Sequence, residues 1–354
     1  MMKCISILFL LGTALKCYSQ KPQEPLPPYP YHTEEVYIEN KSDSIKLAGT
    51  LTLPEKGNNF PVVLLLSGSG AQDRNSELLG HKPFLVLADY LTRNGIAVLR
   101  MDDRDEGQSG GVYNEAGVKE FTEDALYAIN YLKSRKEINK SQIGLIGHSL
   151  GGIVAQVAAA KTNDVAFIVL MASPGIDGDK LMLLQKEVIE RKLGGSDASI
   201  TIGQQQIGMA YKIIRNPELD DEAKKLKLTN YLTAIYGMAL PKQQIEGLVS
   251  QLSFPWFSDL IKYNPSEVLA KIKCPVLALN GSNDLQVVPS NLNAIEEELK
   301  KNGNTKVKAI EMPNLNHLFQ ESKTGLPNEY ANIEQTLSPE VLKIIKNWIV
   351  EITK

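Results

Sequence analysis

The sequence predicts an α/β protein: a doubly wound, mostly parallel sheet with an N-terminal antiparallel hairpin and an inserted helical cap. Three observations support this prediction. Short apolar runs alternate with amphipathic helical patterns from residue 61 onward, a glycine-flanked serine turn joins one such run to a helix, and residues 175–262 carry helical patterns but no strand. Strands that alternate with helices are typical of a parallel sheet covered on both faces.

The individual elements follow from local patterns. Residues 36–39 and 45–53 alternate apolar and polar side chains around a turn, which predicts an antiparallel hairpin with one wet face. Continuous apolar runs predict buried strands at 61–66, 96–101, 143–147, 167–172, 275–280 and, more weakly, 307–310. Apolar stripes at helical spacing separate these runs, and the last helix opens with Ser338 as N-cap followed by Pro339.

Composition fits a globular chain and argues against some partners. The 354 residues are 43% hydrophobic and 22% charged, with a formal net charge of −3 and no basic stripe, so nucleic acid is not an expected partner. The chain is long enough to bury a substantial core. Nothing in the sequence indicates the oligomeric state.

The N-terminus has the features of an export signal. Lys3 precedes an apolar run at 4–15 that is too short to span a bilayer, and cleavage after Ser19 predicts a signal peptide at 1–19 and a secreted or periplasmic protein with no integral membrane segment. Lipid anchoring at Cys17 is the alternative, although Lys16 stands where a small residue is wanted. Cleavage would leave Cys274 alone, so no internal disulfide is expected.

The mature chain divides into three parts on these patterns. Residues 20–32 are proline-dense and predict an extended tether rather than a packed element. Residues 33–174 and 263–354 form the α/β core, and 175–262 form the helical cap. Apolar cap side chains are expected to pack mostly inside the cap. As a group they could also roof a pocket above the strand ends, where ligands bind in open α/β sheets.

Ser149 is the candidate nucleophile. It is the central residue of Gly147-His148-Ser149-Leu150-Gly151, between an apolar run and an alanine-rich helical segment. This strand–turn–helix setting forces strained backbone angles on the serine and exposes its hydroxyl at the positive end of a helix. Gly147 and Gly151 are needed because side chains there would collide with neighbouring elements.

A serine hydroxyl needs a base, and only four histidines are available. His317 follows the last candidate strand, in a loop from which a base can reach the serine turn, and it is the predicted base. His32 lies in the N-terminal region, and His148 should point away from the nucleophile toward packing or a pocket wall. His81 could line the pocket, but a capping or surface role is favoured for it.

The acid that orients the base should follow a strand between the serine and the histidine. Asp284 does so, after the run at 275–280 and a glycine turn, and it would hold the imidazole in the correct tautomer. Asp259 is a weaker rival because no strand leads into it.

The negative oxygen of a tetrahedral intermediate needs two donors. The backbone N–H of Leu150, which follows the nucleophile, should supply one. The other should come from the glycine-rich loop after the strand at 61–66, from Ser69 or alternatively from Gly70.

The serine turn, acid and histidine, in that order, resemble the α/β-hydrolase superfamily. Residues 67–70 and the pair at 73–74 resemble its bacterial secreted carboxylesterase branch, which is also similar to serine aminopeptidase-type and acyl-thioesterase members. Residues 102–109 resemble that branch's D-x-R-G-x-G-x-S turn but carry Asp105 where glycine is usual, so the turn could be stiffer or differently shaped. Arg104 in this turn is expected to be structural, paired with a carboxylate.

The resemblance implies acyl transfer from a small ester to water through an acyl-serine, without metal or organic cofactor. Three other functions remain open at this stage: a peptidase or amidase, an acyl-thioesterase, and a non-catalytic binding protein that retains the fold.

Overall fold

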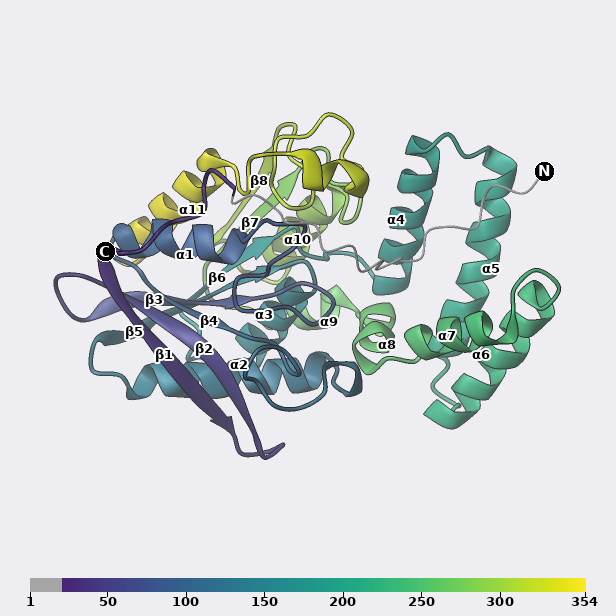
Figure 1. Ribbon diagram of the computed structural model, residues 1–354, viewed down its shortest axis with the longest axis horizontal. Coiled ribbons are helices and arrows are strands. Elements are labelled where there is room, and N and C mark those ends of the chain that lie inside the picture. Colours follow the sequence, from purple (N-terminus) through teal and green to yellow (C-terminus); the bar gives the residue numbers. More distant parts are fainter. Residues whose placement is uncertain (1–20) are drawn as a thin grey trace.

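The computed structural model describes residues 21–354, so the expected signal peptide and Cys17 lie outside the described residues. The described residues form one eight-stranded sheet with the order β1-β2-β4-β3-β5-β6-β7-β8 (Figure 1). The strands are β1 (Tyr31–Asn40), β2 (Ile45–Pro54), β3 (Phe60–Leu66), β4 (Ala97–Met101), β5 (Ile138–His148), β6 (Phe167–Met171), β7 (Val276–Gly281) and β8 (Val307–Met312). From β4 to β8 all neighbours are parallel, which confirms the predicted fold class.

Helices cover both faces of this sheet. Helices α1 (Pro83–Arg93) and α11 (Pro339–Ile352) share an apolar cluster with one face. The other face is covered by α2 (Val118–Ser134), α3 (Leu150–Lys161), α9 (Pro265–Leu269) and α10 (Ser290–Lys301). Because both faces are covered, β3, β5 and β6 are apolar along their paired lengths, as the continuous runs predict.

The N-terminal hairpin extends the main sheet. Strand β1 pairs antiparallel with β2, and β2 pairs antiparallel with β4. The segment before it is not the unpacked tether that its prolines predict. Lys21 Nζ donates to the carbonyl oxygens of Ala331 (3.1 Å) and Ile333 (2.8 Å), and the Gln23 amide bonds the backbone of Leu337 in both directions. Proline density keeps this segment extended, but these polar side chains dock it on the loop before α11.

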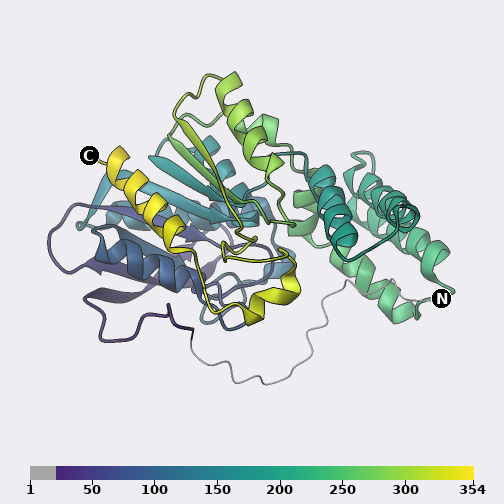
Figure 2. The same cartoon turned by 90° about the horizontal axis from the view of Figure 1, so that it is seen from above.

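Six helices stand between β6 and β7, and the first five of them form a group beside the sheet (Figure 2). They are α4 (Gly178–Lys192), α5 (Asp197–Arg215), α6 (Asp221–Tyr236), α7 (Lys242–Leu252) and α8 (Pro255–Lys262). This cap has its own apolar core, which includes Tyr211, Leu232 and Ile245. Met209 and Met238 instead project into solvent, so they contribute little to that core.

The cap contacts the core mainly through α4 and α8. Leu181 and Leu260 from these helices pack with Leu150 and Ile153 of α3. Asp259 of α8 accepts a hydrogen bond from the backbone N–H of Val118 (2.9 Å) and so caps the first turn of α2. The rival acid is therefore a helix cap, supplied to a core helix by the inserted segment.

The short 3₁₀ helices are η1 (Tyr113–Glu115), next to α8, and η2 (Pro327–Asn332). Within residues 21–354, no helix is both long enough and apolar enough to cross a membrane.

Candidate active site

Ser149 stands at the apex of a sharp turn between β5 and α3. Its backbone angles are φ 54° and ψ −118°, a conformation that costs a non-glycine residue on the order of 1–3 kcal/mol. The turn is held by Ser149 N–H donating to Met171 O (3.0 Å) and Gly152 N–H donating to Ser149 O (2.9 Å). A Cβ on Gly147 would overlap the backbone of Gly151, and a Cβ on Gly151 would overlap the carbonyl oxygens of Leu66 and Ser67.

The loop after β3 lies directly against the serine. A Cβ atom placed on Gly68 would be 3.5 Å from Ser149 Cβ. The N–H of Gly70 donates to Tyr113 Oη (3.0 Å), so this alternative oxyanion donor is already engaged. Among the described residues, the N–H groups of Ser69 and Leu150 have no hydrogen-bond acceptor. The N–H of Leu150 has no partner because it opens α3.

Asp284 and His317 are brought together from two loops. Asp284 follows β7 and His317 follows β8, and His317 Nδ1 lies 2.9 Å from Asp284 Oδ2. Both side chains are buried. Asp284 Oδ1 accepts from the backbone N–H groups of Gln286 (2.8 Å) and Val287 (2.9 Å), which fixes the carboxylate plane. With Oδ2 as an acceptor, the proton of neutral His317 lies on Nδ1, so Nε2 is left able to accept a proton.

His148 links this pair to the serine turn. Its Nε2 lies 2.9 Å from the carbonyl oxygen of His317, and the two ring centroids are 4.7 Å apart. Burial, with a smaller effect of His317, lowers the pKa of His148 to about 3. The ring is therefore neutral at ordinary pH, and because a carbonyl only accepts, Nε2 carries the proton and donates it. The side chain that precedes Ser149 thus holds the backbone of the candidate base beside the turn.

No described group accepts from or donates to the Ser149 hydroxyl, so no hydrogen bond joins Ser149 to the Asp284–His317 pair. Hydrogen bonds of catalytic groups are often longer before substrate binds.

The other histidine that was considered, His81, is buried. Its ring nitrogens lie 3.0 Å from Thr336 Oγ1 and 3.1 Å from Tyr330 O, so it is neither a surface residue nor part of the site.

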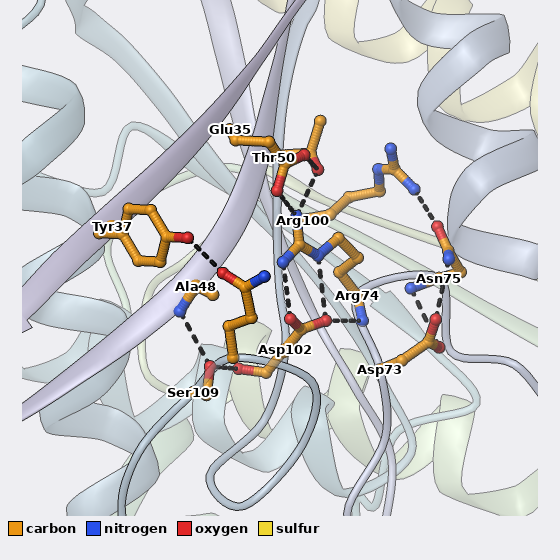
Figure 3. A network of polar contacts seen from close by, with 11 residues as sticks. Glu35, Tyr37, Ala48, Thr50, Asp73, Arg74, Asn75, Arg100, Asp102 and Ser109 are labelled. Carbon is orange, nitrogen blue, oxygen red and sulfur yellow. Dashed lines mark hydrogen bonds and ion pairs between the residues drawn. The ribbon is translucent and has the colours of Figure 1, made fainter.

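A polar network fixes the far half of the glycine-rich loop (Figure 3). Arg74 donates from Nε and Nη2 to the two carboxylate oxygens of Asp102 (3.0 and 2.7 Å), and its backbone N–H donates to the same carboxylate (2.8 Å). Burial raises the pKa of Asp102, but its bonds with Arg74 outweigh burial and hold that pKa below its usual range. Arg74 also bonds Glu35 and Thr50, so the network ties the loop to the N-terminal hairpin.

The turn at 102–109 is held by internal pairing. Arg104 is buried and pairs with Asp124 (2.7 Å) and Asp43 (2.5 Å), which confirms its predicted structural role. Asp105 has φ 68°, the left-handed conformation for which glycine is usual, so aspartate follows the glycine path there under strain. Within residues 21–354, no group of three or more His, Cys, Asp or Glu side chains is arranged to hold a metal ion.

The sheet order, the flanking helices and the serine turn define this chain as an α/β-hydrolase. More narrowly, residues 43–318 match the family described as X-Pro dipeptidyl-peptidase (S15 family), and the chain belongs to that family.

Proteins similar to this chain include two that are named esterases. Esterase EstD of Thermotoga maritima is 25% identical over 324 residues, which cover 91% of this chain and 70% of EstD. Among solved structures, the Pyrococcus furiosus esterase Pf2001 is similar with a TM-score of 0.52 at 16% identity, over 91% of this chain and 93% of that one. Est1E from Butyrivibrio proteoclasticus, solved with ferulic acid, gives a TM-score of 0.54 at 18% identity, over 90% of this chain and all of its own (100%). At these identities the two structures establish the fold alone. Family and relatives together make the chain a hydrolase of ester or peptide bonds.

The serine turn generates a stability prediction with a matched control. Gly151→Ala is expected to lower the free energy of unfolding by about 3 kcal/mol or more, because its methyl group would overlap two backbone carbonyls that cannot move independently. Gly247→Ala, at an exposed position of helix α7 with nothing within 4 Å of the added methyl, should raise the free energy of unfolding by about 0.5–1 kcal/mol. Urea unfolding of the two variants measures both values, and similar effects at the two positions would contradict the close approach.

Proposed function

We propose that this chain is a serine hydrolase that cleaves small carboxylic esters through an acyl-serine intermediate. The observation that carries the proposal is the convergence at one edge of the sheet. Ser149 stands on a strained turn, the Asp284–His317 pair lies against the residue that precedes it, and two unengaged backbone N–H groups flank it.

In this proposal Ser149 Oγ attacks the ester carbonyl carbon while His317 Nε2 accepts the hydroxyl proton. Asp284 keeps Nδ1 protonated and stabilises the imidazolium that forms. The N–H groups of Leu150 and Ser69 stabilise the negative charge on the carbonyl oxygen. The intermediate collapses, and the leaving alcohol takes the proton from His317. Water then attacks the acyl-serine by the same steps, which releases the carboxylic acid and restores Ser149.

His148 suits this cycle because it stays uncharged. A second positive charge so close to His317 would oppose formation of the imidazolium. With the pKa of His148 lowered to about 3 by burial, its ring remains neutral throughout the pH range in which His317 would work.

The first test replaces the nucleophile. Ser149→Ala should reduce kcat/KM for p-nitrophenyl butyrate at least about 1,000-fold, because the remaining groups cannot form the acyl intermediate. Ser141→Ala, on the exposed start of the same strand β5, is the matched control and should keep wild-type activity. A fluorophosphonate probe should label the control but not Ser149→Ala. Equal hydrolysis by both variants would end the proposal, and a wild-type protein that neither hydrolyses nor labels would favour a binding role.

A substrate panel separates esters from amides and thioesters. Peptide cleavage is the second candidate because of the description that the family carries, whereas EstD is named an esterase. We expect kcat/KM for p-nitrophenyl butyrate to exceed that for Gly-Pro-p-nitroanilide and for a butyryl thioester on the purified chain. A higher value for the anilide, lost in Ser149→Ala, would instead assign a dipeptidyl-peptidase.

We also propose that the enzyme works outside the cytoplasm, on the strength of the charged start and short apolar run of residues 1–19. N-terminal sequencing of the protein exported by a bacterial host should begin at Gln20. Recovery of the intact chain from the cytoplasm alone would contradict export, and a lipid-modified N-terminus at Cys17 would replace soluble export by anchoring.

A further inference from the structure

Asp103 is a half-buried carboxylate that the proposed reaction does not use. It follows β4 by two residues and faces the start of the glycine-rich loop. Its carboxylate accepts the Ser67 hydroxyl at 2.7 and 2.8 Å and the backbone N–H of Gln72 at 3.0 Å. The backbone N–H of Asp103 in turn donates to Gln72 O (3.0 Å). Asp103 therefore forms hydrogen bonds with both ends of the segment 67–72, and Ser69, the candidate oxyanion donor, lies between those ends.

No cation compensates this carboxylate. The neighbouring carboxylates have partners, Asp102 with Arg74 and Asp124 with Arg104, whereas none of the ion pairs found in residues 21–354 includes Asp103. Burial raises the pKa of Asp103 to about 7, the Ser67 hydroxyl and the Gln72 N–H oppose that rise, and Glu106 and Asp124 add to it. A carboxylate that is ionised in such surroundings without a cation destabilises the folded protein. Stabilisation of the fold therefore does not explain why Asp103 stands here.

A small cavity adjoins this carboxylate. Its volume is about 50 Å³, and its lining includes Ser67, Asp103, Tyr113 and Leu150. A space of this size can hold ordered water, for which about 10–15 Å³ per molecule is enough. Water there could hydrate Asp103 without relaxing the direct bonds to the loop.

The remaining contacts of the loop explain why those bonds matter. Tyr113 Oη accepts the N–H of Gly70, and Arg74 is fixed by Asp102. Asp103 supplies the other anchors, so the segment is held at residues 67, 70, 72 and 74 while the N–H of Ser69 stays without a partner. The segment is thus held on both sides of residue 69, whose N–H is left without an acceptor among the described residues.

We propose that Asp103 is a positioning residue that holds the loop 67–72 so that the N–H of Ser69 is aimed at the oxyanion formed on Ser149. The inference rests on the proposed function, since it concerns the same transition state. Asp103 touches neither substrate nor nucleophile in this role and acts through Ser67 and Gln72.

The test compares Asp103→Asn with Asp105→Asn in the full chain. Both variants remove one carboxylate from the same turn, but Asp105 is exposed, and none of the hydrogen bonds found within residues 21–354 joins its side chain to the loop 67–72. In Asp103→Asn the Ser67 hydroxyl and the Gln72 N–H would bond a neutral amide oxygen in place of a carboxylate, and these weaker bonds should let the loop loosen. We expect kcat for p-nitrophenyl butyrate to fall about 10- to 100-fold with KM changed less than about twofold, somewhat less than the loss of a whole oxyanion donor. Asp105→Asn should match the wild type.

A stability measurement distinguishes positioning from simple structural support. Because the folded protein raises the pKa of Asp103 above the unfolded value, the native state binds the proton more tightly, and this group weakens the fold progressively as pH rises from about 4 through about 7. Asparagine does not titrate. The Tm of Asp103→Asn at pH 8 should therefore equal or exceed that of the wild type, and the difference should shrink toward pH 5. A Tm at pH 8 well below that of the wild type would assign a structural role and overturn the proposal.

Ser67→Ala provides a second route should Asp103→Asn fail to fold. It removes the donor at the other end of the same contact, so it should lower kcat with KM nearly constant, and the double variant should lose little more than either single one. If the wild type hydrolyses the ester but Asp103→Asn or Ser67→Ala keeps full kcat, the positioning role is wrong and the proposed function stands. If the wild type and Asp105→Asn neither hydrolyse nor label with fluorophosphonate, the proposed function itself is wrong.

Discussion

The structure of the site depends on one close approach, that of the first turn of α3 to the carboxyl end of β3. Glycine at position 151 lets the helix backbone reach the carbonyl groups of Leu66 and Ser67. This contact brings the loop after β3 against Ser149, which must then adopt a positive φ. Ser149 and the glycine-rich loop after β3 are thus neighbours because of a backbone contact. The histidine and the acid are placed relative to that contact by the ends of β7 and β8.

Local patterns in the sequence were sufficient to predict the parallel sheet and the serine turn. The apolar runs predicted the parallel strands because both faces of the sheet are covered, and the serine turn was recognisable because it is contiguous. Contacts between distant segments were not predictable in the same way. The bond from His148 to the backbone of His317 joins residues 169 positions apart, and Lys21 and Gln23 dock on a loop more than 300 positions away. Such contacts leave no periodic or compositional signal, so the tether was misjudged and His148 was assigned only to packing or a pocket wall.

Two adjacent carboxylates, Asp102 and Asp103, hold the same loop although their electrostatic surroundings differ. Asp102 forms an ion pair with Arg74, and Arg74 in turn bonds Thr50 of the hairpin. The negative charge of Asp102 therefore stabilises the contact by which the loop is tied to the hairpin. Asp103 holds residues 67 and 72 of the same loop with hydrogen bonds alone, and burial opposes its ionisation. Both residues belong to one sequence motif, and only the groups around each carboxylate in the folded protein distinguish their roles.

The helix cap supplied by Asp259 has a consequence for how this architecture can vary. The insertion between β6 and β7 satisfies a backbone N–H at the start of α2 in the core, so the two parts are not independent modules. Burial raises the pKa of Asp259, as expected for a carboxylate enclosed between the two parts. Any homologue that exchanges the insertion for one of different shape must provide another acceptor at this point or begin α2 differently. The insertion can therefore change in sequence and shape only in ways that preserve this shared junction.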